Sequence, residues 1–348
     1  MPGHYLWYRD GKVETTRYWE ARFNPDESLT EEQAVDEIEK VFEESVNAHK
    51  ISDVEVGCFL SSGVDSSYVS TYFADQKTFT VGFDFGEKYN ENQLGGTAEQ
   101  KDRRGAPHSS DFLRGILGQC GARSIPYGSA FGRPILHRSV FCFQAGQRIR
   151  QGRAFRRGRD ELFGGYTIYN EPHVFKAYQK ILPSKFRLWL AKEVKKLPHF
   201  KGQSFIIRGS RETEEKFIGN AFMYDDEDKR RILKDPSIVT RPQSLCKKFY
   251  DRVRGYDQET KMQYLDINLW MVGDILLKAD RMSMANSLEL RVPFLDKEVF
   301  KVASKLPTRL RVNKRIPNTL CGRLPTGICL RKPPRRKSLA SRFPPECG

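Results

Sequence analysis

The chain lacks several features that would mark particular classes of protein. Among its 348 residues there is no run of about 18 apolar residues, the length that a membrane-spanning helix needs. It has seven cysteines, an odd number, and no CxxC pair, which argues against a disulfide framework and against a zinc site. The N-terminus has no charged-then-apolar signal pattern. These absences favour a cytoplasmic protein with no membrane partner, long enough for one large domain or two modest ones.

Acidic residues are scarce in two stretches of the chain. Residues 101–159 contain 13 Lys and Arg against 2 acids, and residues 315–348 contain 8 against 1. The net charge of the whole chain is +15, so the remainder has a net charge of −3. Five of the seven cysteines also lie in these stretches. A basic chain suggests a nucleic-acid partner, but this distribution indicates two foreign-looking inserts in a mildly acidic protein, and we expect no nucleic acid.

The first hundred residues predict the start of an α/β fold. Residues 4–19 predict a β-hairpin around Asp10-Gly11. Residues 30–48 predict an amphipathic helix that begins with a capping box. A buried strand, a Gly/Ser-rich loop, a helix and a second strand follow at 54–60, 61–65, 66–74 and 78–83. This β-loop-α-β order predicts a doubly wound, mainly parallel sheet.

The second half predicts mainly helices. Residues 101–159 show no sustained period, and regular patterning returns at Asp160. The clearest apolar helix covers 264–288 and is ended by Pro293, and another helix is expected over 296–304. The fold class is therefore α/β with a helical C-terminal part. The tail, 315–348, predicts no fold.

The most informative motif is the loop Ser61-Ser62-Gly63-Val64-Asp65-Ser66-Ser67. A loop between a strand and a helix presents backbone N–H groups and the helix N-terminus to a phosphate. Asp65 would repel a bare phosphate, so the loop suits a phosphate that carries Mg²⁺. The loop lacks the lysine of a kinase-type P-loop. The alternative, an ordinary Ser/Gly turn, fits the placement between strand and helix less well.

This loop resembles the SGGxDS loop of the ATP-pyrophosphatase superfamily, with Ser62 in place of a glycine. Three further blocks resemble the synthetase half of glutamine-hydrolysing asparagine synthetases: residues 79–84, 160–166 and 279–296. The third block, ADRMSMANSLELRVPFLD, is long and specific. The resemblance covers about 1–100 and 160–314, and it implies an adenine nucleotide alpha-hydrolase-like fold over 30–314.

The resemblance also implies a site. The backbone around Leu60 and Val81 would hold adenine, the loop would hold the β- and γ-phosphates, and Asp65 and Asp160 would bind Mg²⁺. The implied ATP-binding positions are Leu60, Ser61, Ser62, Gly63, Val64, Asp65, Ser66, Ser67 and Val81. In the family reaction, aspartate attacks ATP to form β-aspartyl-AMP and pyrophosphate, and ammonia then displaces AMP.

The predicted helix over 264–288 places Asp274, Lys278 and Arg281 on one face, at i, i+4 and i+7. Together with Asp160, Lys278 and Arg281 are the candidate catalytic residues, because they would line the substrate side of the cleft. An ion-pair ladder within the helix explains the same spacing equally well. Glu289 and Arg291, beside Pro293, are expected to be structural.

Two departures from the family bear on activity. The first is that residues 1–22 resemble the end of a glutaminase domain, whose cysteine nucleophile has no counterpart here. We therefore expect free ammonia to be the only nitrogen source. The second is that the family motif SGEGADELFGGY is replaced by FRRGRDELFGGY, so that Arg157 stands in place of its glutamate.

A shift of reading frame would explain the second departure. Codons TTC CGG CGA GGG CGN for FRRGR, read one base later, encode Ser-Gly-Glu-Gly and the start of Ala. Residues 126–140 and the tail can be re-read in the same way. The hypothesis is that 101–159 and 315–348 are out of frame, and it predicts weak or absent activity.

Two other function classes remain open at this level. A β-lactam-synthetase-like ligase shares the fold and the adenylation step, although the block at 279–296 favours the asparagine branch. A non-catalytic nucleic-acid-binding fragment would use the Arg-rich stretches, but few aromatic residues alternate with these arginines. The sequence says nothing of an oligomeric state.

Overall fold

The computed structural model describes residues 2–54, 56–59, 64–73, 78–79, 153–155, 158–198, 200–219 and 226–312. Several predictions therefore lie outside the described residues: those for Leu60 to Gly63, for Val81, for most of 101–159 and for the tail at 315–348.

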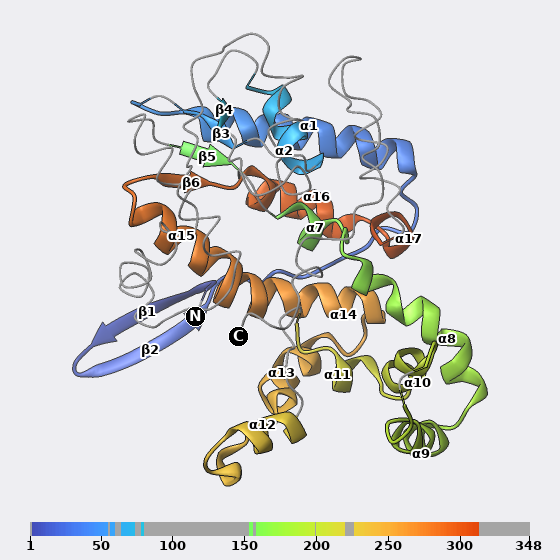
Figure 1. Ribbon diagram of the computed structural model, residues 1–348. Coiled ribbons are helices and arrows are strands. Elements are labelled where there is room, and N and C mark those ends of the chain that lie inside the picture. The colour runs from blue at the N-terminus through green and yellow to red at the C-terminus, as the bar shows by residue number, and fades with distance from the viewer. Residues whose placement is uncertain are drawn as a thin grey trace, which may run out of the picture.

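The predicted hairpin is confirmed. Strands β1 (His4–Arg9) and β2 (Lys12–Arg17) pair antiparallel, with Arg9 opposite Lys12. The two turn residues, Asp10 and Gly11, both have positive φ, at 51° and 75°. That conformation is the type I′ turn that matches the twist of a two-residue hairpin. The hairpin projects from the body of the molecule (Figure 1).

The predicted first helix is also confirmed. Helix α1 (Glu31–Lys50) begins with the expected capping box, in which the Gln33 N–H donates to Thr30 Oγ1 and the Thr30 N–H donates to Gln33 Oε1. Its apolar stripe, which includes Ile38 and Phe42, is buried. This stripe packs against helix α16 (Lys297–Lys305) and the 3₁₀ turn η5 (Pro293–Leu295), so α1 joins the two ends of the described chain.

The β-loop-α-β unit is present, with shorter strands than predicted. Strand β3 covers Cys58–Phe59, helix α2 covers Val64–Thr71, and strand β4 covers Thr78–Phe79. Strands β3 and β4 pair in parallel. A second parallel pair is formed by β5 (Arg153–Phe155) and β6 (Glu289–Arg291), neither of which was predicted. Because β5 lies against β3, the four strands follow one another in the order β4, β3, β5, β6 (Figure 1).

Helices make up most of the remaining described chain, as predicted. Helix α7 (Arg159–Leu162) follows β5. The helices after it are α8 (Glu171–Ile181), α9 (Ser184–Val194), α10 (Gln203–Gly209), α11 (Thr213–Lys216), α12 (Asp226–Ile232) and α13 (Pro242–Tyr250). The 3₁₀ turns η1, η2 and η3 cover Thr167–Asn170, Pro236–Ile238 and Asp251–Val253. The helix predicted over 296–304 is α16, one residue along, and it is capped by the Asp296 side chain.

The long apolar helix predicted over 264–288 differs from the prediction in two ways. It runs without a break through α14 (Gln258–Leu265), η4 (Asp266–Leu276) and α15 (Leu277–Met284), and η4 is a π-helix. The prediction that it reaches 288 is wrong: α15 ends at Met284, and Ser287, with a positive φ of 53°, lies in the turn that leads to β6. A periodicity argument assumes 3.6 residues per turn throughout, so it cannot detect a π-helical segment.

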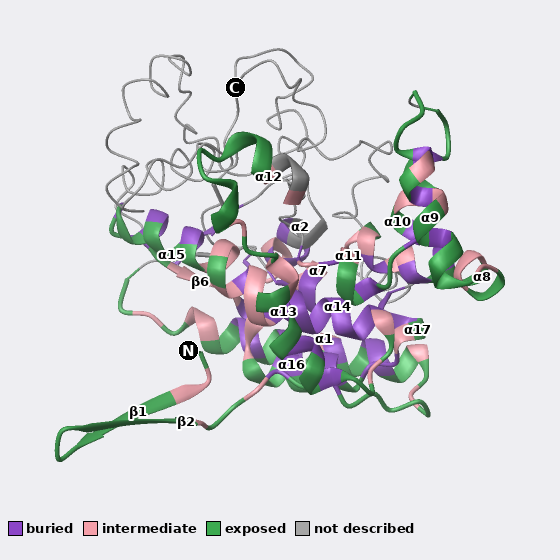
Figure 2. Ribbon diagram, turned by 90° about the horizontal axis from the view of Figure 1, so that it is seen from below, coloured by how far each residue is buried: buried purple, intermediate pink, exposed green. Residues whose placement is uncertain are grey.

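The core lies between α1, α2 and the C-terminal helices, where buried residues gather in Figure 2. Phe42 is at its centre and is fully buried. Its ring lies 5.1 Å from that of Tyr68 in α2 and 4.3 Å from that of Phe294 in η5. These contacts tie α2, and with it the end of the Gly/Ser loop, to both halves of the chain.

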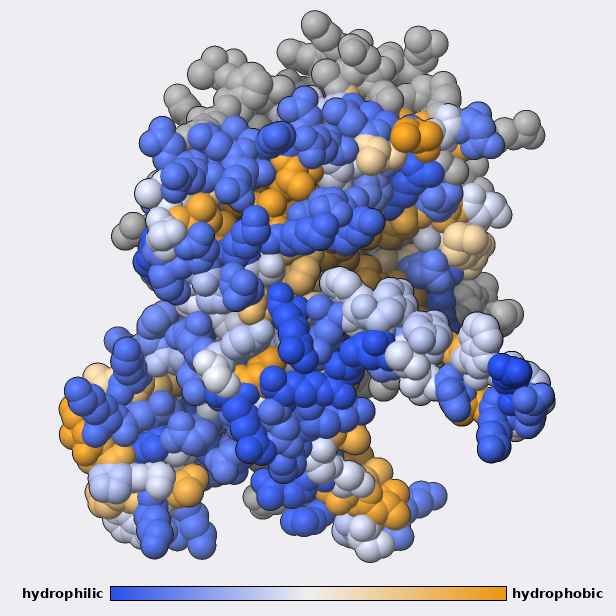
Figure 3. Space-filling model, turned by 180° about the vertical axis from the view of Figure 1, so that it is seen from behind, coloured by the Kyte–Doolittle hydropathy of each residue, from blue (hydrophilic) through white to orange (hydrophobic). Residues whose placement is uncertain are grey.

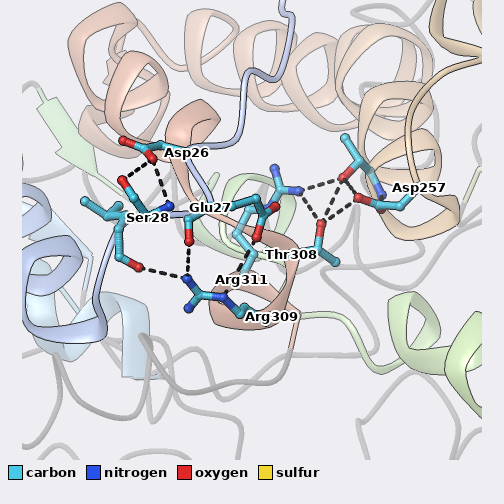
Figure 4. Close-up of polar contacts among 9 residues, drawn as sticks. Asp26, Glu27, Ser28, Asp257, Thr308, Arg309 and Arg311 are labelled. Atoms are coloured by element: carbon cyan, nitrogen blue, oxygen red, sulfur yellow. Dashed lines mark hydrogen bonds and ion pairs between the residues drawn. The ribbon is translucent and has the colours of Figure 1, made fainter.

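A polar network holds the end of the described chain in place (Figure 4). Asp257 caps α14 by accepting from the Thr260 N–H at 2.7 Å, and its carboxylate also accepts from the Thr308 hydroxyl at 2.7 Å. Arg311 Nη2 donates to Thr260 Oγ1 at 2.7 Å, and Arg309 donates to the carbonyls of Glu27 and Leu29. Helix α17 (Thr308–Arg311) is thereby joined to α14 and to the segment before α1.

We expect this network to make stability depend on pH through Asp257. Burial raises the pKa of this carboxyl, but hydrogen bonds from Thr260 and Thr308 outweigh burial and hold the pKa below its ordinary value of 3.8. A carboxyl whose pKa is lower in the folded than in the unfolded state stabilises the fold at pH values above its unfolded-state pKa. This contribution is lost as the pH falls through the folded-state pKa. Asp257→Asn, which turns one acceptor oxygen into a donor, should cost about 1–2 kcal/mol of unfolding free energy at pH 7.

Urea unfolding at pH 7 and pH 3 tests this expectation, and the cost of Asp257→Asn should shrink at pH 3. Glu259, two residues away and in contact with Asp257, should show the opposite dependence on pH. Burial raises the pKa of Glu259, so its charged form destabilises the fold at pH 7. Glu259→Gln should therefore raise the free energy of unfolding at pH 7, and this gain should shrink as the pH falls. An Asp257→Asn cost that is equal at both pH values would contradict the assignment.

The surface in Figure 3 is mostly hydrophilic, with hydrophobic patches on two lobes that extend away from the sheet. One lobe comprises α8, α9 and α10 and exposes Val174, Ile181 and Leu188, and the other exposes Ile232 and Ile238. Over the part of the chain that the structure describes, no helix is both long enough and apolar enough to cross a membrane.

Candidate functional site

The Gly/Ser loop leads into the first turn of α2. Residues Val64, Asp65, Ser66 and Ser67 form the start of this helix, and the Ser66 side chain is buried. The strand before the loop contains Cys58, whose thiol is fully buried, and burial raises its pKa to about 12. This cysteine therefore has no nucleophilic role.

The second half of the site is the turn that follows β5, residues 158–166. Gly158 begins α7 with a φ of 112°, and a Cβ there would lie 2.4 Å from Leu295 Cδ2. Figure 1 shows α2 and α7 beyond the same end of the strands. In open α/β sheets, ligands bind in the crevice outside the carboxyl ends of the strands. In this chain, the start of α2 and the start of α7 both lie in that region.

The Asp160 side chain is held in a defined place on this turn. Its carboxylate lies so close to Gly165 that a Cβ on that residue would be 1.9 Å from Oδ1. The Gly165 N–H donates to the Asp160 carbonyl at 2.9 Å, which closes the turn. On its other side, Oδ1 lies 3.2 Å from Arg159 Nη2. The Asp160 side chain remains 32% exposed, so solvent and ligands can reach it.

The rest of the turn is fixed by buried hydrogen bonds. The Tyr166 hydroxyl donates to Glu161 Oε1 at 2.8 Å, and Gln263 Nε2 donates to the carbonyls of Glu161 and Leu162. Burial, together with the nearby Glu161 and Asp160 carboxylates, raises the pKa of Tyr166 above its usual value, so the phenol stays a donor. Glu161 thus closes the turn, and Asp160, which pairs with Arg159, is the carboxylate of the two that stays partly exposed.

The three residues on the long helix lie partly as predicted. Lys278 Nζ is 3.5 Å from Asp274 Oδ2, and the Lys278 side chain is only 3% exposed. The i,i+4 pairing is therefore confirmed, although it crosses from the π-helix η4 into α15. Arg281 lies on the next turn and is exposed. Within the described chain, no hydrogen bond or ion pair joins Lys278 or Arg281 to Asp160. Glu289 and Arg291 are structural as expected: Arg291 donates to the carbonyls of His49 and Ile51 at the end of α1, and to Glu289 Oε1 at 2.9 Å.

The turn offers suitable chemistry for a hard cation, with one obstacle. A carboxylate oxygen is the ligand that Mg²⁺ prefers, and Asp160 provides one. Among the residues with described side chains, however, no three His, Cys, Asp or Glu gather around one point. The guanidinium of Arg159 also lies where a cation would approach Oδ1.

Sequence reasoning missed the two residues that border the Asp160 carboxylate. In the sequence, Arg159 belongs to the stretch that departs from the family motif, and Gly165 belongs to the block 160–166 that resembles it. Gln263 was missed as well, although it is fully buried. A buried glutamine in an apolar helix is a detectable signal, because burying an amide without hydrogen bonds costs free energy.

The described turn belongs to a region that matches a known family. The family model for asparagine synthase matches residues 37–104 and 157–347. The chain belongs to the asparagine synthase family. The matched residues include the start of α2, the turn around Asp160 and the long helix, and they leave 105–156 unmatched.

Individual relatives agree with this assignment. The chain is 34% identical over 344 residues to asparagine synthetase [glutamine-hydrolyzing] 1 of Bacillus subtilis, an alignment that covers 96% of the chain and 53% of that protein. It is 34% identical over 308 residues to a putative asparagine synthetase [glutamine-hydrolyzing] of Mycobacterium bovis, covering 86% of the chain and 47% of that protein. The chain thus spans about half the length of the curated relatives it matches. Family membership implies the adenine nucleotide alpha-hydrolase-like fold, with which the parallel strand pairs agree.

Proposed function

We propose that this chain is a synthetase domain that activates aspartate with ATP and converts it to asparagine, releasing AMP and pyrophosphate. The observation that carries the proposal is the placement of α2 and α7 at one end of the parallel strands, in a chain of the asparagine synthase family. The two relatives are named as asparagine synthetases. The proposed nitrogen donor at this site is ammonia, and the proposed location is the cytoplasm.

ATP would lie along the strand end, with its phosphates at the start of α2. The first N–H groups of a helix have no partner within the helix, and the helix dipole is positive there, so this end attracts phosphate. The residues proposed for this role are those of the loop, Ser61 to Ser67, and those proposed for adenine are Leu60 and Val81. Cleavage between the α- and β-phosphates leaves pyrophosphate at the helix end.

The chemistry has two steps that this site would organise. A side-chain carboxylate oxygen of aspartate attacks the α-phosphorus, the bond to the bridging oxygen breaks, and pyrophosphate leaves with the electron pair. Ammonia then attacks the acyl carbon of β-aspartyl-AMP, the acyl–oxygen bond breaks, and AMP leaves while a proton passes to solvent. Lys278 and Arg281 are proposed to bind negative charge on the substrate side, and the Asp274 carboxylate fixes the direction of Lys278. Holding the reactants in line supplies much of the rate enhancement.

Mg²⁺ is the proposed metal cofactor, with Asp65 and Asp160 as its protein ligands. When bound, it would neutralise charge on the phosphates. The chain's own contribution is to hold the Asp160 carboxylate still, through Gly165 beneath it and the bonds of Tyr166 and Gln263 around it.

Exchange of labelled pyrophosphate into ATP, with and without aspartate, tests the proposed function. Aspartate-dependent exchange is expected in the unchanged chain and should be lost in Asp160→Asn. The exchange should be slow, because Phe155 and Arg156 replace the Ser-Gly pair of the family motif. Exchange that is equal with and without aspartate in both proteins would overturn the proposal.

We also propose the domain organisation that the sequence suggests. Residues 1–22 are a hairpin from a glutaminase domain, residues 30–314 are the synthetase domain, and 101–159 and 315–348 are out of frame. The unmatched interval 105–156 supports the first of these two stretches. The family match continues to 347, so the proposal for the tail rests only on its composition and on the possible re-reading of its codons. The nucleotide sequence decides the matter, and an uninterrupted frame encoding these same residues would refute it.

A further inference from the structure

A cationic side chain of the described turn lies beside Asp160. Arg159 and Asp160 are neighbours in the first turn of α7, and Arg159 Nη2 lies 3.2 Å from Asp160 Oδ1, within reach of a hydrogen bond. The Arg159 side chain is only 15% exposed, so its guanidinium is held close to the turn and does not extend into solvent. The two residues therefore form a partly buried ion pair at the point where the site needs a free carboxylate.

This position is unfavourable for an arginine unless a carboxylate compensates it. Removing a guanidinium from water costs free energy. The Asp160 carboxylate offsets part of this cost, and its Oδ1 is confined on its other side by Gly165. Oδ1 cannot turn away from Arg159 toward Gly165, because there is no space for it to enter.

We propose that the Arg159 guanidinium is a tethered competitor of the divalent cation at Asp160, so that metal binds this site only after Arg159 has been displaced. The inference rests on the proposed function for its choice of metal. It goes further by assigning to Arg159 a control over metal affinity that no motif implies. A guanidinium within 3.2 Å of Oδ1 and a divalent ion on the same oxygen repel each other across a partly dehydrated gap.

The competition is tested with Mn²⁺ alone as the probe, in the full chain and without nucleotide. Binding is followed by the electron paramagnetic resonance signal of free Mn²⁺. Arg159→Ala should tighten Mn²⁺ binding by about tenfold, as expected for a partly buried pair that is stronger than an exposed one. Arg159→Lys keeps the charge and should give a smaller gain, whereas Asp160→Asn should weaken binding.

Two controls separate the pair from other effects. Arg22→Ala removes one positive charge from a pair with Glu20, far along the chain from α7, and should leave Mn²⁺ binding within about twofold. The double variant Arg159→Ala with Asp160→Asn should bind as weakly as Asp160→Asn alone, because the gain requires the carboxylate. Circular dichroism checks folding, and Arg159→Gln replaces Arg159→Ala if that variant fails to fold.

Three results would overturn the inference: equal Mn²⁺ affinity in Arg159→Ala and the unchanged chain, the same gain in Arg22→Ala, or a gain that persists in the double variant. The outcome is independent of the pyrophosphate exchange. Tighter Mn²⁺ binding without aspartate-dependent exchange would keep the role of Arg159 and reject the proposed function. Aspartate-dependent exchange together with equal Mn²⁺ affinity in Arg159→Ala and the unchanged chain would keep the proposed function and reject the role of Arg159.

Discussion

Gly165→Ala should lower aspartate-dependent pyrophosphate exchange by about 100-fold, the loss expected when a catalytic group moves by roughly 1 Å. An added Cβ would lie 1.9 Å from Asp160 Oδ1 and 2.7 Å from Asp160 Cγ. Contacts this short cannot persist, so either the carboxylate rotates or the turn opens. Either movement takes Asp160 away from the place where the Tyr166 and Gln263 hydrogen bonds hold the turn.

The loss should be local, and its measurement should show this. We expect Gly165→Ala to weaken Mn²⁺ binding as Asp160→Asn does, with a cost to unfolding of about 1–3 kcal/mol from the crowded turn. Gly273→Ala is a matched control in the long helix, since no described atom lies within 4 Å of its added Cβ. The control should keep the exchange rate, and alanine should favour the helix by up to about 1 kcal/mol. Full exchange in Gly165→Ala would show that the Asp160 position does not matter.

Phe42→Ala should lower the free energy of unfolding by about 3–5 kcal/mol, the range for a fully buried phenylalanine. Its ring contacts Tyr68 of α2, Tyr72 directly after α2 and Phe294 of η5, so the cavity would lie where the first and last parts of the described chain meet. Helix α1, helix α2 and the turn η5 are each held by other contacts, so they can move only partly into the cavity that the phenylalanine ring leaves.

Urea unfolding with a common denaturant slope gives the measurement. Phe186→Ala is the matched control: Phe186 is 46% exposed on α9, where it contacts Trp189, and its loss should cost less than about 1 kcal/mol. If both variants unfold at the same urea concentration, Phe42 is not at the centre of the core. This role in the core also connects stability to the candidate site, because α2 begins at the end of the Gly/Ser loop.

Local signals predicted local structure well. Asp10-Gly11 marked the hairpin turn and Thr30 marked the start of α1, because both depend on residues within a few positions of each other. Strands β5 and β6 were not predicted, since each has only three residues and each is stabilised by a partner more than 130 positions away. Such pairing leaves no periodic pattern in the sequence.

The same contrast applies to the site. Asp160 was identified from the motif around it, and the Asp274–Lys278 pair from helical spacing. The Arg159 contact with Asp160 could not be predicted, because adjacent residues on a helix normally point in different directions. The role of Gly165 depends on a turn that brings it back against Asp160 five positions earlier, which only the folded chain shows.

The pairing of β5 with β6 has a consequence for how such a sheet tolerates changes of sequence. A parallel ladder is made of main-chain N–H and C=O groups, which every residue except proline supplies in full. A strand can thus keep its place in the sheet while its side chains are exchanged wholesale. The place of a strand in the sheet and the side chains it carries are then separate properties: a changed stretch of sequence can keep the main-chain pairing while the groups that a ligand would meet are different.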